Sequence, residues 1–149
     1  MPRLQIVIDC ANPAVLVEFW AIVLGYVVEP PPAGHPDWTT YWRSIGVPED
    51  ELDPDGDNAD SIVDPRGHGP RIFFQIVPEA KQVKNRVHLD HMVADRSQPL
   101  AERRLTVDAE VERVVAAGAT AVRRGTSEAG VDHYGVTLQD PEGNEFCVA

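Results

Sequence analysis

The residues best suited to chemistry lie in the segment 84–90, Lys-Asn-Arg-Val-His-Leu-Asp, near the middle of the chain. Side chains of a strand alternate between two faces, so His88 and Asp90 are predicted on one face and Val87 and Leu89 on the other. An imidazole can bind a metal or move a proton near neutral pH, although a lone strand histidine is also common as a hydrogen-bonded core residue. We expect the face that carries His88 to line a pocket.

The elements that must position this segment repeat along the chain. A strand is predicted over Leu4–Cys10, followed by a helix that begins at Pro13 after the N-cap Asn12 and ends at Gly25. The apolar stripe of this helix is Leu16, Phe19, Trp20 and Val23. Further strands are predicted at 26–29, 38–42 and 71–77. The first half therefore reads as a βαβββ unit.

The second half follows the same order. The His88 strand leads to a helix with the stripe Val107, Val111, Val114 and Val115, which ends at Gly118. The helix begins either at Thr106 or upstream within 100–105. Strands are predicted at 119–123, 134–139 and 145–148. The turns at 64–67 and 140–143, Asp-Pro-Arg-Gly and Asp-Pro-Glu-Gly, occupy equivalent places and support a duplication.

Two stretches of the first half bear on ligand binding. In a strand over 38–42, Trp38 and Trp42 would share one side and could face a ligand. The stretch 47–64 is acidic and rich in turn residues, and we interpret it as a surface loop. Its Asp53, Asp55 and Asp57 resemble a calcium loop only loosely, because the glycine is at the fourth position and the final glutamate is absent. The strand 71–77 is almost wholly apolar, which predicts cover on both faces, with Gln75 as its polar interior residue.

Composition excludes several classes of function. The chain has 149 residues, a formal net charge of −11, and 13 Lys and Arg against 24 Asp and Glu, so no basic face for nucleic acid is expected. There is no apolar run long enough to span a membrane and no export signal at the N-terminus, which predicts a cytoplasmic protein. In that reducing compartment Cys10 and Cys147 are expected as free thiols.

These motifs together resemble the glyoxalase/bleomycin-resistance/dioxygenase superfamily, the vicinal oxygen chelate (VOC) proteins. The resemblance rests on Phe-Trp and Leu-Gly at 19–25, the histidine strand, Ala-Gly-Ala at 117–119 and the ending 140–146, Asp-Pro-Glu-Gly-Asn-Glu-Phe. Segments 84–90 and 144–147 narrow it to a glyoxalase-like subgroup. The resemblance implies an α+β fold in one domain, 1–149, with modules 1–78 and 79–149 forming a cupped mixed sheet around a cavity.

The resemblance also implies one metal-ligand position on each of four strands. Carried onto this sequence, the positions are Gln5, Gln75, His88 and Cys147. Metal-dependent members place a glutamate where this chain has Cys147, so at most one anionic ligand is supplied. The chain therefore either binds a divalent ion (Zn, Ni, Mn or Fe) or has no cofactor. The shortage of anionic ligands favours the absence of a cofactor. Glu145 shares the parity of Cys147 and could point the same way.

Two functions remain open from the sequence. The first is a lyase or isomerase that acts on a small oxygenated metabolite, with His88 and Cys147 as catalytic residues. The second is a metal-free protein of the drug-sequestering type, in which aromatic side chains stack on a planar ligand. The substrate-binding residues expected are Trp38, Trp42, Phe73 or Phe74, Asp90 and Glu145. The expected partners are a small-molecule ligand and a second copy of the chain in a homodimer.

Overall fold

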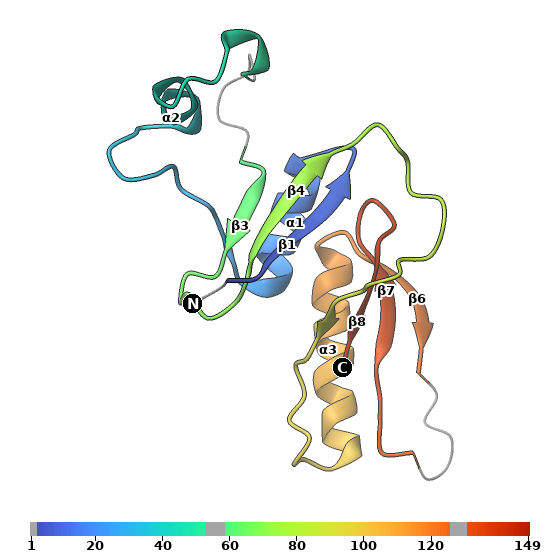
Figure 1. Cartoon of the computed structure of the whole chain (residues 1–149). Coiled ribbons are helices and arrows are strands. Elements are labelled where there is room, and N and C mark those ends of the chain that lie inside the picture. The colour runs from blue at the N-terminus through green and yellow to red at the C-terminus, as the bar shows by residue number, and fades with distance from the viewer. Residues whose placement is uncertain (1–2, 53–58, 126–130) are drawn as a thin grey trace. The chain divides into compact units, whose positions relative to one another are not determined.

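The computed structural model describes residues 3–52, 59–125 and 131–149. The chain divides into two compact units. Unit 1 comprises Met1–Ala21 and Gly25–Pro78, and unit 2 comprises Ile22–Leu24 and Glu79–Ala149. Each unit is described by itself (Figure 1). None of the helices in the described ranges is long and apolar enough to cross a membrane.

Unit 1 is built on a four-stranded sheet of order β1-β4-β3-β2. Its elements are β1 (Gln5–Cys10), α1 (Pro13–Leu24), β2 (Val27–Val28), α2 (Trp38–Ser44), the 3₁₀ helix η1 (Glu49–Glu51), β3 (Ser61–Val63) and β4 (Arg71–Ile76). Strand β1 pairs with β4 in parallel, and the other pairings are antiparallel. Helix α1 lies behind β1 and β4 in Figure 1.

The first predicted helix is confirmed in detail. Leu16, Phe19, Trp20 and Val23 are all buried, so the stripe at helical spacing forms the core of α1. The helix begins at Pro13 and ends at Gly25, whose φ of 66° lies in the left-handed region that favours glycine.

Unit 2 repeats the arrangement with a sheet of order β5-β8-β7-β6. Its elements are β5 (Asp90–His91), α3 (Leu100–Ala116), β6 (Thr120–Arg124), β7 (Val136–Gln139) and β8 (Glu145–Val148). Strand β5 pairs with β8 in parallel, as β1 does with β4. Helix α3 runs beside β8 (Figure 1). The α+β class and the two βαβββ modules expected from the sequence are therefore confirmed.

The core of unit 2 lies between α3 and the sheet. Buried residues from the helix are Val107, Val111 and Val114, and those from the strands are Val136, Leu138, Phe146 and Val148. Val115 is 42% exposed, so its predicted place in the stripe is wrong. The helix begins at Leu100, directly after Pro99, which decides in favour of the upstream alternative. Thr106 consequently lies inside the helix, where its hydroxyl donates to the carbonyl of Glu102.

The prediction that 38–42 forms a strand is wrong, since these residues open helix α2. Tryptophan, threonine and tyrosine favour strands, but Asp37 caps the helix by accepting from the Thr40 N–H at 2.6 Å. Helical spacing then places Trp38, Tyr41 and Trp42 on one face, with ring centroids 5.0–5.8 Å apart.

The missing strand of the first module lies inside the predicted acidic loop. Residues 61–63 form β3, which pairs with β2 and β4, and 49–51 form η1, so the described part of 47–64 contains two regular elements. Asp53, Asp55 and Asp57 lie outside the described residues.

Two further expectations change. Strand β4 is not covered on both faces: Ile72 and Phe74 are buried, whereas Gln75 is exposed and Ile76 is 65% exposed. The paired part of the His88 strand is only two residues long and begins at Asp90, so His88 lies just before it.

Candidate cation site and ligand pockets

The two faces of the unit 2 sheet have different roles. Phe146 and Val148 of β8 pack under α3, and the alternate residue Cys147 lies on the other face. Asp90 is the register partner of Cys147 on the neighbouring strand β5. Thr137 is the partner of Cys147 on β7, with its hydroxyl oxygen 3.6 Å from Sγ. The sheet thus presents polar side chains on the face opposite the helix.

His88 joins Asp90 and Cys147 on that face. The His88 Nδ1 atom lies 3.0 Å from Oδ1 of Asp90, two residues along the chain. One ligand atom from each of His88, Asp90 and Cys147 lies within 4.8 Å of the other two. His88 and Asp90 are exposed and Cys147 is half-buried, so the cluster is open to solvent on one side.

The chemistry of these donors fits a divalent cation. Imidazole nitrogen, carboxylate oxygen and thiolate sulfur are the three donor types that zinc prefers, and catalytic zinc sites use three protein ligands with one open position. Tetrahedral bonds of the usual lengths separate donors by about 3.3–3.6 Å, more than 1 Å less than the 4.8 Å within which these atoms lie. Binding therefore requires the exposed side chains of His88 and Asp90 to turn towards Cys147. Asp90 also supplies a carboxylate. The ligand set predicted from the sequence lacked this type of donor, which was the reason for expecting no cofactor.

Glu145 does not join this cluster, although it shares the parity of Cys147. Its carboxylate accepts from the Asn85 N–H at 2.9 Å and pairs with Lys81 Nζ at 3.0 Å. The Asn85 hydrogen bond and then Lys81 lower the pKa of Glu145 to about 2. Glu145 therefore fixes the segment that leads into His88.

Gln5 has a structural partner in unit 1. Its Oε1 atom accepts from Nη1 of Arg71 at 3.0 Å, and the same guanidinium bonds Glu29 and Ser61. An oxygen held against a guanidinium is a poor ligand for a cation, because the two positive charges repel each other. Gln5 lies in unit 1 and His88 in unit 2, and their facing arrangement stays a prediction.

The structure does not bring Gln5 and Gln75 together. The register pairs Gln5 with Arg71, and Gln75 with Asp9 at the other end of the strands. Four residues of parallel strand separate the glutamines by about 13 Å, too far for both to bind one ion.

The registers of the two modules identify which positions are equivalent. Gln75 pairs with Asp9 in unit 1, as Cys147 pairs with Asp90 in unit 2. The next hydrogen bonds also correspond, from Val77 N–H to the Cys10 carbonyl and from Ala149 N–H to the His91 carbonyl. Two residues before Asp9 is Val7, which is therefore the counterpart of His88. The first module has an apolar residue where the second has a histidine.

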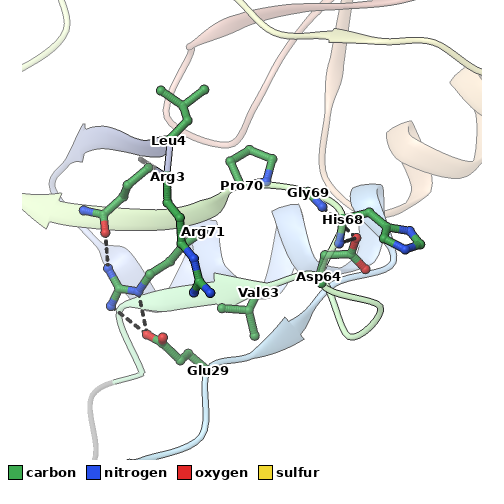
Figure 2. Close-up of a pocket in the computed structure, with 11 residues that line it drawn as sticks. Arg3, Leu4, Glu29, Val63, Asp64, His68, Gly69, Pro70 and Arg71 are labelled. Atoms are coloured by element: carbon green, nitrogen blue, oxygen red, sulfur yellow. Dashed lines mark hydrogen bonds and ion pairs between the residues drawn. The ribbon is translucent and has the colours of Figure 1, made fainter. Parts of the chain in front are cut away.

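The described residues of unit 1 line two cavities that bear on ligand binding. The larger, of about 810 Å³, has several charged side chains in its lining (Figure 2). Arg71 and Glu29 interact at one end, and Asp64 accepts from the backbone N–H groups of His68 and Gly69 at the other. The pKa of Asp64 is lowered, most strongly by a hydrogen bond from the Arg66 N–H and also by those from Gly69 and His68. The carboxylate thus closes the turn between β3 and β4.

The smaller cavity, of about 410 Å³, has aromatic walls. Trp38 and Trp42 of α2 and Phe73 and Phe74 of β4 all line it, so all the aromatic residues expected to bind a ligand surround one space. The tryptophan rings stack with centroids 5.5 Å apart and planes 24° from parallel. Helix α2, which sequence analysis missed, is the element that brings the two indoles together.

The chain is thus an α+β protein of two βαβββ modules, with potential metal ligands on one face of the second module's sheet. The Glyoxalase-like domain family model matches residues 5–149, and the chain belongs to this family. The resemblance to the VOC superfamily is thereby confirmed. A comparison with curated proteins gives no match.

Solved structures share the fold at low identity. A glyoxalase/bleomycin resistance protein/dioxygenase family enzyme from Burkholderia phytofirmans PsJN is 18% identical, with a TM-score of 0.57 over 97% of this chain and 94% of that one. The fosfomycin resistance protein FosX from Listeria monocytogenes is 10% identical, with a TM-score of 0.58 over 99% and 91%. A mutant of that FosX, in complex with Mn(II) and 1S,2S-dihydroxypropylphosphonic acid, is 11% identical, with a TM-score of 0.56 over 99% and 89%.

Proposed function

We propose that the chain is a glyoxalase-like lyase or isomerase that acts on a small oxygenated metabolite, with His88, Asp90 and Cys147 as the ligands of a divalent cation. The observation that carries the proposal is the convergence of three different donor types within 4.8 Å on one face of a sheet. The FosX complex with Mn(II) is in keeping with a cation in this fold. When bound, such an ion acts as a Lewis acid that polarises oxygen atoms of a substrate.

The residues around the cluster have separate tasks in this proposal. His88 and Asp90 are exposed, so they can meet a ligand that arrives from solvent. The His88 Nδ1 atom lies 3.0 Å from Asp90 Oδ1, and this contact orients the imidazole beside the carboxylate. Glu145 and Lys81 hold the preceding segment in place through Asn85.

Cobalt titration tests the cation site. Cobalt(II) bound to a thiolate gives an intense charge-transfer absorption, and we expect the protein to show this absorption with a stoichiometry of about one ion. Cys147→Ser should abolish it, and Asp90→Asn should weaken cobalt binding about tenfold or more. Cys10→Ser is the matched control, because Cys10 is buried in unit 1. Equal absorption in the Cys147→Ser protein would refute the assignment.

A metal-free binding protein is the second candidate. The observation that favours it is the aromatic cavity in unit 1, which forms without any residue of the cation site. Elemental analysis of protein purified without chelator separates the two. A near-stoichiometric ion that is lost with chelator and restored on re-addition supports the enzyme, and its absence supports the binding protein.

Localisation and assembly complete the proposal. We place the protein in the cytoplasm. It forms a homodimer and binds a small-molecule ligand. Sedimentation equilibrium tests the assembly, since a mass near 16.4 kDa would show a monomer and contradict the dimer.

A further inference from the structure

The aromatic cavity of unit 1, called the slot below, is lined by side chains of α2, β4 and the segments around them. It is lined by Trp38 and Trp42, whose rings stack on each other, and by Phe73 of β4. The Trp38 indole N–H donates to the Glu29 carbonyl at 3.1 Å, which fixes one ring of the stack. Trp42 is 39% exposed, so solvent reaches the slot. A volume of about 410 Å³ lies in the range of pockets that hold small organic ligands.

The charges around the slot are of one sign. Glu51 at the end of η1 and Asp60 beside β3 are carboxylates in the lining, and none of the described lining residues is basic. Asp60 Oδ1 accepts from the Ser61 hydroxyl at 2.7 Å, which orients the carboxylate. The remaining lining is apolar, apart from Thr39. A ligand of this slot therefore meets aromatic faces and negative charge together.

Both features select a cation. The face of an indole carries negative electrostatic potential and attracts cations, and two carboxylates repel an anion of the same shape. We propose that the slot formed by Trp38, Trp42 and Phe73, with Glu51 and Asp60 at its edge, binds planar aromatic cations. The proposal specifies the ligand class of the metal-free candidate. It requires no metal and no residue of unit 2.

Three aromatic dyes of similar size provide the test, of which proflavine and acridine share the same planar three-ring frame. Proflavine is a cation, acridine is neutral at mildly alkaline pH, and anilinonaphthalene sulfonate is an anion. Fluorescence titration in the presence of EDTA should show proflavine binding about tenfold tighter than acridine, with the anion weakest. Equal affinity for proflavine and acridine, or tighter binding of the anion, would overturn the proposal.

Variants locate the binding. Trp42→Ala should weaken proflavine and acridine alike, about tenfold, because it removes half of the stack. The double variant Glu51→Gln with Asp60→Asn should remove most of the preference for proflavine, the remainder coming from the indole faces, and should leave acridine unchanged. Glu112→Gln on α3 alters net charge outside the slot and should change neither dye. An unchanged preference for proflavine in the double variant, or an equal loss in Glu112→Gln, would refute the slot as its site.

The dye and cobalt experiments fail separately. EDTA removes any ion, so loss of the cation site would leave the dye result unchanged. The Cys147→Ser protein should bind proflavine as the unmodified chain does. Circular dichroism of each variant verifies that α2 and the sheets are retained.

Discussion

Replacing Arg71 tests whether Gln5 belongs to the internal bonding of the sheet or to a metal site. The guanidinium donates to Glu29 Oε2 at 2.7 Å, to Gln5 Oε1 at 3.0 Å and to Ser61 Oγ at 2.7 Å. Gln5 is on β1, Glu29 follows β2 directly and Ser61 is on β3. One side chain on β4 thus links all four strands of unit 1.

We expect Arg71→Met to lower the free energy of unfolding by about 2–3 kcal/mol, since it keeps the apolar stem and removes every donor. The pair with Glu29 contributes about 1 kcal/mol, because side-chain exposures of 31% and 22% allow water to screen it. The bond to buried Ser61 contributes a similar amount, and the exposed bond to Gln5 about 0.5 kcal/mol. Arg71→Lys should cost about half as much, because one ammonium lacks the planar fork.

Urea denaturation followed by circular dichroism measures these changes. Arg66→Met, in the exposed turn before β4, is the control and should shift the free energy of unfolding by about 0.5 kcal/mol or less. A double-mutant cycle with Gln5→Ala should give a coupling of about 0.5 kcal/mol. No coupling to Arg71, together with weaker cobalt binding in Gln5→Ala, would instead place Gln5 at a metal.

Three further predictions concern the second module and the first helix. The hydrogen bond from Asn85 lowers the pKa of Glu145 from 4.5 to about 2, so the stability that this bond contributes is complete above pH 4.5 and is lost as the pH falls towards 2. Hydrogen exchange should show the protection of the Asn85 amide falling over that range and absent in Glu145→Gln, and pH-independent protection would contradict this. Phe146→Ala should destabilise the protein by about 3–5 kcal/mol, because the ring is 1% exposed. Val122→Ala, at a site 56% exposed, should change stability little, and equal losses in urea titrations of the two would refute the core assignment. Gly25→Ala should cost about 1 kcal/mol in thermal denaturation, since its φ of 66° disfavours a side chain, and an unchanged melting temperature would show that the helix end tolerates alanine.

The helices with long apolar stripes were predictable, because burial on one face imposes a spacing that is visible in sequence. Leu16, Phe19, Trp20 and Val23 show it, and so do three of the four valines assigned to α3. Shorter elements follow local contacts that compete with residue preference. Helix α2 depends on the Asp37 cap, and β3 has only three residues within an acidic stretch. Neither has enough length for a periodic pattern.

The candidate site was predictable in part for a related reason. Alternation along 88–90 places His88 and Asp90 on one face, and the terminal turn sets the position of Cys147, so the three residues follow from parity and register. Asp90 was expected to bind substrate, and its suitability as a cation ligand emerges only from the 3.0 Å contact with His88. The register of β1 against β4, which separates Gln5 from Gln75, depends on strand pairing that sequence spacing does not contain.

The equivalence of the two parallel strand pairs makes the cation cluster transferable. Asp9 already occupies the place of Asp90, while Val7 and Gln75 stand where the second module has His88 and Cys147. The two substitutions Val7→His and Gln75→Cys would therefore give the first module the same three donor side chains. The two modules share the same backbone arrangement, and two side chains separate the module without the three donors from the module that has them. The second module thus provides the pattern for designing a second cation site in the first module.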